Sequence, residues 1–136
     1  MAANDVVFVD SSAWYALVSS SDSFHRSARV AYSELIDSHV RLYTTSYVLV
    51  ETFALVHRRL SFEILRSLVD SLSSVAEVYW IGSRVHRDAW NRMTVKAGQG
   101  LSFVDWSTVV AAEEFHASIF AFDQGLRATG AMVIPV

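Results

Sequence analysis

Short apolar runs alternate with longer segments in which apolar residues recur every three or four positions. The short runs predict strands at Val6–Val9, Arg41–Thr44, Ala76–Ile81, Ser118–Phe122 and Met132–Ile134. The longer segments predict helices from about Ala13, over Phe24–Asp37, from Thr45 or Ser46 to about Arg59, from Ser61 to Ser73, over Ser83–Ala97 and over Phe103–Phe115. Strands that alternate with helices in this way predict an α/β fold, with a mostly parallel sheet covered by helices on both faces.

Polar residues mark where several of these helices begin and end. Ser11 or Ser12 is placed to cap the first helix and Ser61 the fourth, because a serine hydroxyl accepts a hydrogen bond from a free backbone N–H of the first turn. The glycine-containing run from Lys96 to Gly100 is expected to end the helix that starts at Ser83.

Composition indicates one compact domain in a reducing compartment. The 136 residues are 52% hydrophobic and 12% aromatic, enough for a core without disulfides, and cysteine is absent. The segment from Met1 to Val9 lacks the basic and long apolar parts of a signal peptide, and no apolar stretch reaches the ~20 residues that span a bilayer. We therefore expect a single domain over residues 1–136 and a soluble, cytoplasmic protein without membrane association.

The charge balance bears on the class of partner. A net charge of −3 and an isoelectric point near 5.9 argue against a DNA-coating protein, which carries a strong positive excess. They do not exclude a nuclease, because acids gathered at a metal site can offset a basic rim elsewhere.

Two acids follow apolar runs that are predicted to be strands. Asp10 ends Val-Val-Phe-Val and Asp123 ends Ile-Phe-Ala-Phe, so both are expected at the carboxyl ends of strands, where open α/β sheets hold their ligands. An acid in an ordinary strand-to-helix turn is the alternative for either residue.

Glu51 lies within an apolar stripe of a predicted helix, with Tyr47, Val48 and Leu55 three or four positions away. An inward-facing carboxylate needs a partner, which is either a cation or an ion pair with Arg58 or Arg59. Glu77 also has apolar neighbours, but an acid in a strand can point to the open face, and we leave it out of the site.

Asp105 has two interpretations. Ser102-Phe103-Val104-Asp105 matches the capping box that precedes an apolar helix, which explains the acid without any chemistry. If Asp10, Glu51, Asp105 and Asp123 converge instead, they cannot all stay ionised unless a cation joins them. All-oxygen ligation suits Mg²⁺ or Mn²⁺ rather than zinc.

The order and surroundings of the four acids resemble the PIN-domain family, and within it the VapC-type toxins of toxin–antitoxin pairs. The matching segments are Val7-Phe8-Val9-Asp10-Ser11-Ser12, Val50-Glu51, Ser102-Phe103-Val104-Asp105, Ala121-Phe122-Asp123-Gln124-Gly125-Leu126 and Gly130-Ala131-Met132-Val133-Ile134-Pro135. Together they span essentially the whole chain.

The resemblance implies a three-layer PIN-like fold with a five-stranded parallel sheet, and Mg²⁺ or Mn²⁺ ligated by Asp10, Glu51, Asp105 and Asp123. It also implies hydrolysis of single-stranded or looped RNA and a cognate antitoxin that binds through a hydrophobic segment. Ser11 and Ser12 could orient a ligand or a metal-bound water, with helix capping as the alternative.

Two positions depart from the family pattern. Ala121 stands where a hydroxyl residue is frequent, and Val104 stands where the residue before the third acid is often polar. These two residues leave open a second function, a PIN-like module that binds RNA or a protein without cutting.

Other residues are candidates for contacts with partners. Arg84, Arg92 and Lys96 recur at i+4 spacing and could contact RNA phosphates, although a solvated helix face is the simpler interpretation. Tryptophans near predicted element ends could support a homodimer, although core packing is the favoured interpretation for each: Trp80, Trp90 and Trp106.

Overall fold

The computed structural model describes residues 5–97 and 99–136. Five strands form one sheet in the order β3-β2-β1-β4-β5, and all four pairings in this described part are parallel. The strands are β1 Val6–Val9, β2 Arg41–Thr45, β3 Glu77–Tyr79, β4 Ser118–Phe120 and β5 Val133–Ile134. The helices are α1 Ser11–Val18, α2 His25–Asp37, α3 Ser46–Arg59, α4 Phe62–Val75, α5 Ser83–Val95, α6 Phe103–Glu114 and the 3₁₀ helix η1 Gln124–Thr129. The predicted fold class is confirmed.

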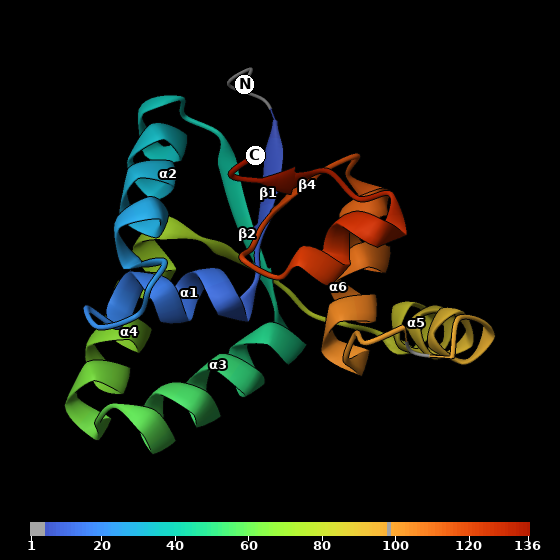
Figure 1. Ribbon diagram of the computed structural model, residues 1–136, viewed down its shortest axis with the longest axis horizontal. Helices are drawn as coiled ribbons and strands as arrows, with labels where there is room; N and C mark the ends of the chain where they lie inside the picture. The colour runs from blue at the N-terminus through green and yellow to red at the C-terminus, as the bar shows by residue number, and fades with distance from the viewer. Residues whose placement is uncertain (1–4, 98) are drawn as a thin grey trace.

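Side chains of the strands alternate between two cores, one on each face of the sheet. Val7 and Val9 pack with buried residues of α1 to α4, whereas Phe8 and Ile119 pack with α5, α6 and η1. Figure 1 shows this layering, with α1 and α2 on one side of the strands and α6 on the other. Burial on both faces explains why the strands are apolar runs rather than alternating ones.

Most predicted elements are confirmed to within a few residues, and three details differ. Asp10, rather than Ser11 or Ser12, caps α1, because its carboxylate accepts from the backbone N–H of Ser12 at 3.1 Å. Strand β4 ends two residues before the predicted Phe122, whose N–H donates to the Ser12 hydroxyl at 2.9 Å.

The third difference is η1, which was not predicted, because its QGLRAT sequence reads as a turn. Helix α5 ends before the glycine-containing run, with Lys96 as its C-cap, and Gly98 of that run lies outside the described residues.

The topology places a switch point of the sheet at the end of β1. This strand pairs with β2 on one side and with β4 on the other, so the connections leave the sheet in opposite directions. In Figure 1 the strands run downward, and α1 and α3 begin at the lower ends of β1 and β2. Ligands of open α/β sheets bind at such a switch point.

A buried relay fixes α1 against this end of the sheet. The indole Nε1–H of Trp14 donates to Thr44 Oγ1 at 3.1 Å, and the Thr44 hydroxyl donates to the carbonyl oxygen of Val9 at 3.1 Å. The relay joins α1, β2 and β1 directly before Asp10, so the position of that acid follows from the packing of the core.

Candidate metal-binding site

Asp10 is the most buried of the four predicted acids. Its side chain is 2% exposed, and its Oδ2 accepts from the Ser12 hydroxyl at 2.7 Å. Its Oδ1 is buried and has no hydrogen-bond partner among the described residues. Burial raises the pKa of Asp10 from 3.8 to about 6 against the lowering effect of Ser12, and the charges of Asp105 and Glu51 add to the rise.

Asp105 both caps α6 and belongs to the acidic group. The capping box is complete: Asp105 N–H donates to Ser102 Oγ at 3.1 Å, and Ser102 N–H donates to Asp105 Oδ2 at 2.9 Å. The side chain is nonetheless buried beside other acids. Burial raises its pKa most, and the negative charges of Asp123 and Glu51 raise it further. The two interpretations of this residue are therefore compatible.

Glu51 is held by a serine rather than by an arginine. The Ser11 hydroxyl donates to Glu51 Oε1, which joins α1 to α3. Arg58 and Arg59 are exposed near the other end of α3, and no ion pair joins either of them to Glu51 within the described chain. The expected alternative of a buried ion pair is wrong.

Asp123 lies three residues beyond β4 and caps η1. Its Oδ1 accepts from the backbone N–H of Gly125 at 2.9 Å. A Cβ at position 125 would lie 3.2 Å from this oxygen and 2.9 Å from Leu101 Cδ2, so glycine allows the backbone to approach the carboxylate.

The electrostatic effects show which acids are neighbours. Asp105 has charged neighbours on several sides. Its charge raises the pKa of Asp10, and the charges of Asp123 and Glu51 raise the pKa of Asp105. Within the described residues, no three acidic or histidine side chains lie close enough together to hold one ion. Each carboxylate is instead turned toward a hydroxyl or a backbone N–H, as Glu51 is toward Ser11.

The chemistry of this donor set fits a divalent cation. Carboxylate oxygens are hard ligands, and neighbouring carboxylates lower their mutual repulsion when a cation lies between them. The buried, unpartnered Oδ1 of Asp10 is an oxygen that a cation would satisfy. Closing the site requires side-chain rotation of the more accessible acids.

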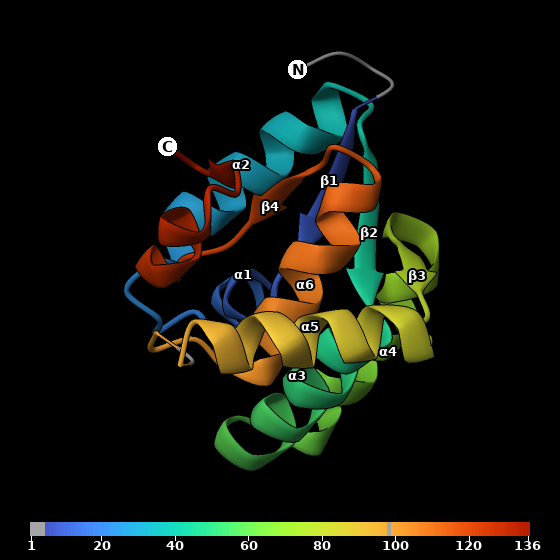
Figure 2. The same ribbon diagram turned by 90° about the vertical axis from the view of Figure 1, so that its right-hand side faces the viewer.

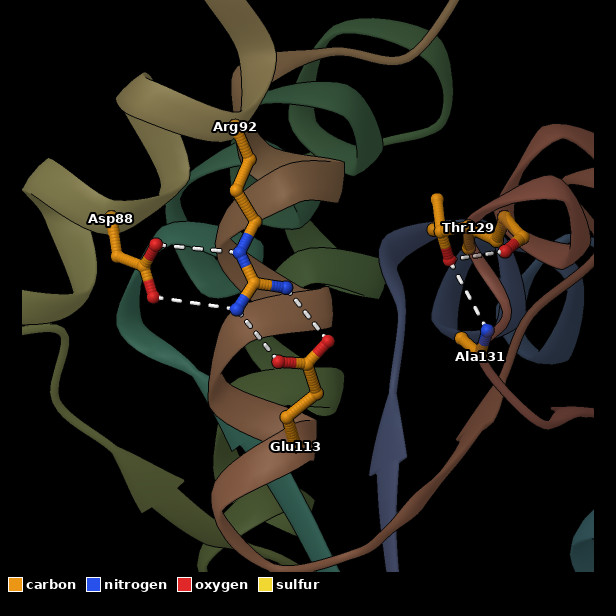
Figure 3. Close-up of polar contacts among 6 residues, drawn as sticks. Asp88, Arg92, Glu113, Thr129 and Ala131 are labelled. Carbon is orange, nitrogen blue, oxygen red and sulfur yellow. Dashed lines mark hydrogen bonds and ion pairs between the residues drawn. The ribbon is translucent and has the colours of Figure 1, made fainter. Parts of the chain in front are cut away.

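Two arginines of α5, Arg84 and Arg92, are engaged with acids of α6. Arg92 donates to Glu113 at 2.7 and 2.8 Å and to Asp88 Oδ1 at 3.3 Å, as Figure 3 shows. Arg84 pairs with Glu114, and Lys96 is exposed. Phosphate binding by these residues stays a prediction, and it would compete with the ion pairs of the two arginines.

Among the predicted tryptophans, Trp106 is part of the core. Its side chain is 3% exposed and packs in the cluster around Phe8, so the core-packing interpretation is confirmed for this residue. Trp80 and Trp90 are 75% and 55% exposed. The homodimer itself stays a prediction.

The rings of Tyr47, His86 and Phe103 contact one another, which no motif in the sequence predicts. They come from three different helices, and no local pattern in the sequence connects them. Only the tertiary packing of these helices brings them together.

Five parallel strands with acids at their carboxyl edge define an open α/β domain with an acidic site at its switch point. The chain belongs to the PIN-domain family, whose model matches residues 7–132.

Individual relatives agree with this family. The chain is 28% identical over 127 residues to the 23S rRNA-specific endonuclease VapC20 of Mycobacterium tuberculosis, covering 92% of this chain and 95% of the relative. The crystal structure of M. tuberculosis VapC20, described as a Sarcin-Ricin loop cleaving toxin, superposes with a TM-score of 0.82 at 26% identity and covers 93% of this chain and 96% of that one.

More distant structures share the fold. VapBC2 from Rickettsia felis, bound to a DNA fragment from its promoter, matches with a TM-score of 0.72 at 12% identity, over 94% of this chain and 96% of the other. PAE2754 from Pyrobaculum aerophilum matches with a TM-score of 0.63 at 20% identity, over 97% and 85%. None of the helices in the described part of this chain has the length and apolar character needed to cross a membrane.

The raised pKa of Asp10 predicts a pH-dependent stability in chelator. Well below pH 3.8 the carboxyl is protonated in both states. As pH rises through 3.8 toward 6 the unfolded state ionises first, so the free energy of unfolding falls. A shift from 3.8 to about 6 corresponds to about 3 kcal/mol above pH 6. Asp10→Asn has no carboxyl to ionise at this position. Its free energy of unfolding should therefore rise relative to that of the wild type between pH 4 and 7. Urea unfolding of both proteins measures the difference. A difference that stays constant with pH would contradict the burial of an ionised Asp10.

Proposed function

We propose that this protein is a divalent-metal-dependent endoribonuclease and the toxin of a toxin–antitoxin pair. The observation that carries the proposal is the buried Asp10 carboxylate, with an unpartnered oxygen, beside the charges of Asp105 and Glu51. A buried carboxylate with an unpartnered oxygen lowers the stability of the fold, and such groups are typical of functional sites. The likeness to VapC20, a 23S rRNA-specific endonuclease, supports RNA as the substrate.

The proposed roles of the residues follow from their places. Asp10, Glu51, Asp105 and Asp123 would hold Mg²⁺ or Mn²⁺, which activates water and stabilises a leaving oxygen when bound. Ser12 and Ser11 orient the first two acids by hydrogen bonds to Asp10 and Glu51. The capping box fixes Asp105 at the start of α6. A substrate with unpaired nucleotides fits best, because a loop can present its backbone to a site at a sheet edge.

The alternative function is a PIN-like module that binds RNA or protein without cutting. Ala121 is buried in the core, and Val104 packs against the other core cluster, so neither gives the acids a polar neighbour. All four acids are present, however, and Asp10 is hydrogen-bonded by Ser12 despite its burial. These features favour the enzyme, acting in the cytoplasm as the absence of cysteine suggests.

Asp10→Asn should abolish RNA cleavage without unfolding the protein. The amide keeps the shape of the side chain and removes the charge that would hold the metal. Cleavage of a looped RNA is measured in Mn²⁺, in Mg²⁺ and in chelator, with circular dichroism as the check on folding. Asp70→Asn, at an exposed position of α4, is the matched control and should cleave as the wild type does. Full activity of folded Asp10→Asn would exclude the proposed site.

Mn²⁺ should raise the melting temperature of the wild type. A cation that binds only the folded state stabilises it by roughly 2.7 kcal/mol at a hundredfold excess over its dissociation constant. That corresponds to several degrees for a domain of this size. Asp105→Asn should show a smaller shift, while its amide oxygen can still accept from Ser102 N–H. Calorimetry with metal and with chelator tests this, and a melting curve indifferent to metal would count against a four-acid site.

The antitoxin has a candidate binding place away from the acids. A groove of about 640 Å³ lies between α1, α2 and α4, and it includes the partly exposed side chains of Ile36 and Ile64. We propose that it receives the hydrophobic segment of the antitoxin. Ile64→Glu should prevent co-purification of the two co-expressed proteins, whereas Val69→Glu, also exposed on α4 but outside the groove, should not. Co-purification at wild-type yield with Ile64→Glu would place the antitoxin elsewhere.

A further inference from the structure

Four rings meet where α3, α5 and α6 approach one another. The centroid of Phe103 lies 6.0 Å from that of Tyr47, 5.0 Å from that of His86 and 6.3 Å from that of Trp90. Tyr47 lies in the first turn of α3, His86 and Trp90 lie one turn apart on α5, and Phe103 is the first residue of α6. We call Tyr47, His86, Trp90 and Phe103 the four-ring cluster.

The four-ring cluster adjoins the acidic site through two of its helices. Tyr47 lies four residues before Glu51, so the two side chains occupy one side of α3 a single turn apart. Phe103 and Asp105 both lie in the first turn of α6. Figure 2 shows α5 crossing α6, with α3 close by, and the rings of His86 and Trp90 on α5 contact Phe103 of α6. The cluster is therefore built on the two helices that carry Glu51 and Asp105, and its Tyr47 lies one turn from Glu51.

The two α5 rings of the cluster are exposed, unlike the aromatic residues that stabilise the fold, whereas Tyr47 and Phe103 are half-buried and Phe103 packs against the core around Phe8. Phe8 and Tyr43, which stack at 5.5 Å, are 0% and 9% exposed. In the four-ring cluster Trp90 is 55% exposed, and His86 is exposed as well. Core packing does not require an indole on the surface, and its apolar face is left partly in water.

The rings are also held in place before any ligand binds. The Tyr47 hydroxyl and His86 Nδ1 are hydrogen-bonded at 2.5 Å, and the two rings stand at 89° to each other. Phe103 is fixed by its position at the start of α6, next to the Ser102 cap. Rigid aromatic surfaces lose little conformational entropy when a ligand stacks on them.

We propose that the four-ring cluster stacks an unpaired base of the RNA whose phosphate the acids engage. Bases in single-stranded RNA stack on Trp, Tyr, Phe and His rings, and this contact tolerates different bases because every base has a π face. Of the α5 arginines near the cluster, Arg84 and Arg92 are paired with acids, and the exposed Arg87 donates to Ser83. Binding through bases would complement binding of the backbone through a metal. The inference rests on the proposed function for the choice of RNA over other aromatic ligands.

The test is the affinity of the wild type and of variants for a single-stranded oligoribonucleotide in chelator, where no cleavage occurs. Trp90→Ala and His86→Ala should each weaken binding about 5- to 100-fold, the loss expected for one stacked base. Trp90→Phe should restore most of the affinity and Trp90→Leu should not, because leucine is apolar but has no π face. The slope of affinity against salt should not change, since no phosphate contact is lost.

Matched controls come from the other end of α3. His57 and Phe62 form a similar exposed pair, with ring centroids 5.9 Å apart, and His57→Ala and Phe62→Ala should bind as the wild type does. An abasic oligomer of the same length should bind all the proteins equally. In a Trp80→Phe background, RNA but not the abasic oligomer should quench the fluorescence of exposed Trp90.

Several outcomes would overturn the inference. The first two are an affinity of Trp90→Ala for the oligoribonucleotide equal to that of the wild type, and an affinity of Trp90→Leu equal to that of Trp90→Phe. The third is no measurable binding of the oligoribonucleotide by the wild type. The fourth is light scattering that shows a dimer disrupted by Trp90→Ala. The last result would assign the cluster to a second copy of the chain. If RNA is cleaved but the cluster variants bind normally, only this inference fails. If binding depends on the cluster but no metal supports cleavage, only the proposed nuclease function fails.

Discussion

The carboxylate of Asp10 lies almost completely out of water and within range of other carboxylates, and much of the surrounding structure compensates for this. Ser12 donates to one of its oxygens, and Ser11 and Ser102 hold Glu51 and Asp105 in the same way. These contacts restrain the acids without neutralising their charge. Burial and the neighbouring charges nevertheless raise the pKa of Asp10 and of Asp105. A cation between the carboxylates would offset their mutual repulsion.

The sheet topology makes this arrangement possible. Because β1 pairs with β2 and β4, the segments after these strands meet at one edge, and Asp10, α3 and Asp123 follow from them. The acids therefore depend on non-local packing. Rings on α3, α5 and α6 contact one another, so the proposed polar and aromatic contacts with RNA would come from one set of helices.

The sequence predicted the fold well, because strands buried on both faces are apolar runs and their helices have clear periodicity. Asp10 could be identified because it ends such a run, and Asp105 because a capping box is a local pattern. The partner of Glu51 could not be predicted, since Ser11 reaches it from forty positions away in the chain. The sequence could not separate the buried Trp106 from the exposed Trp80 and Trp90 for a related reason: near an element end, only tertiary packing decides whether a ring is buried. The four-ring cluster is a product of three helices and has no signature in any one of them.

The Ser12 hydroxyl makes two hydrogen bonds at the switch point: it donates to Asp10 Oδ2 and accepts from Phe122 N–H. These bonds follow the backbone hydrogen bond from Asp10 N–H to the carbonyl oxygen of Phe120. The spacing of the first acid from the segment that carries the last one is therefore set by strand register, not by the length of the connections between elements. Insertions in surface loops, which chains tolerate readily, would leave that spacing intact. Relatives can thus diverge widely in their loops, and in what those loops recognise, while the carboxylates keep the same separation.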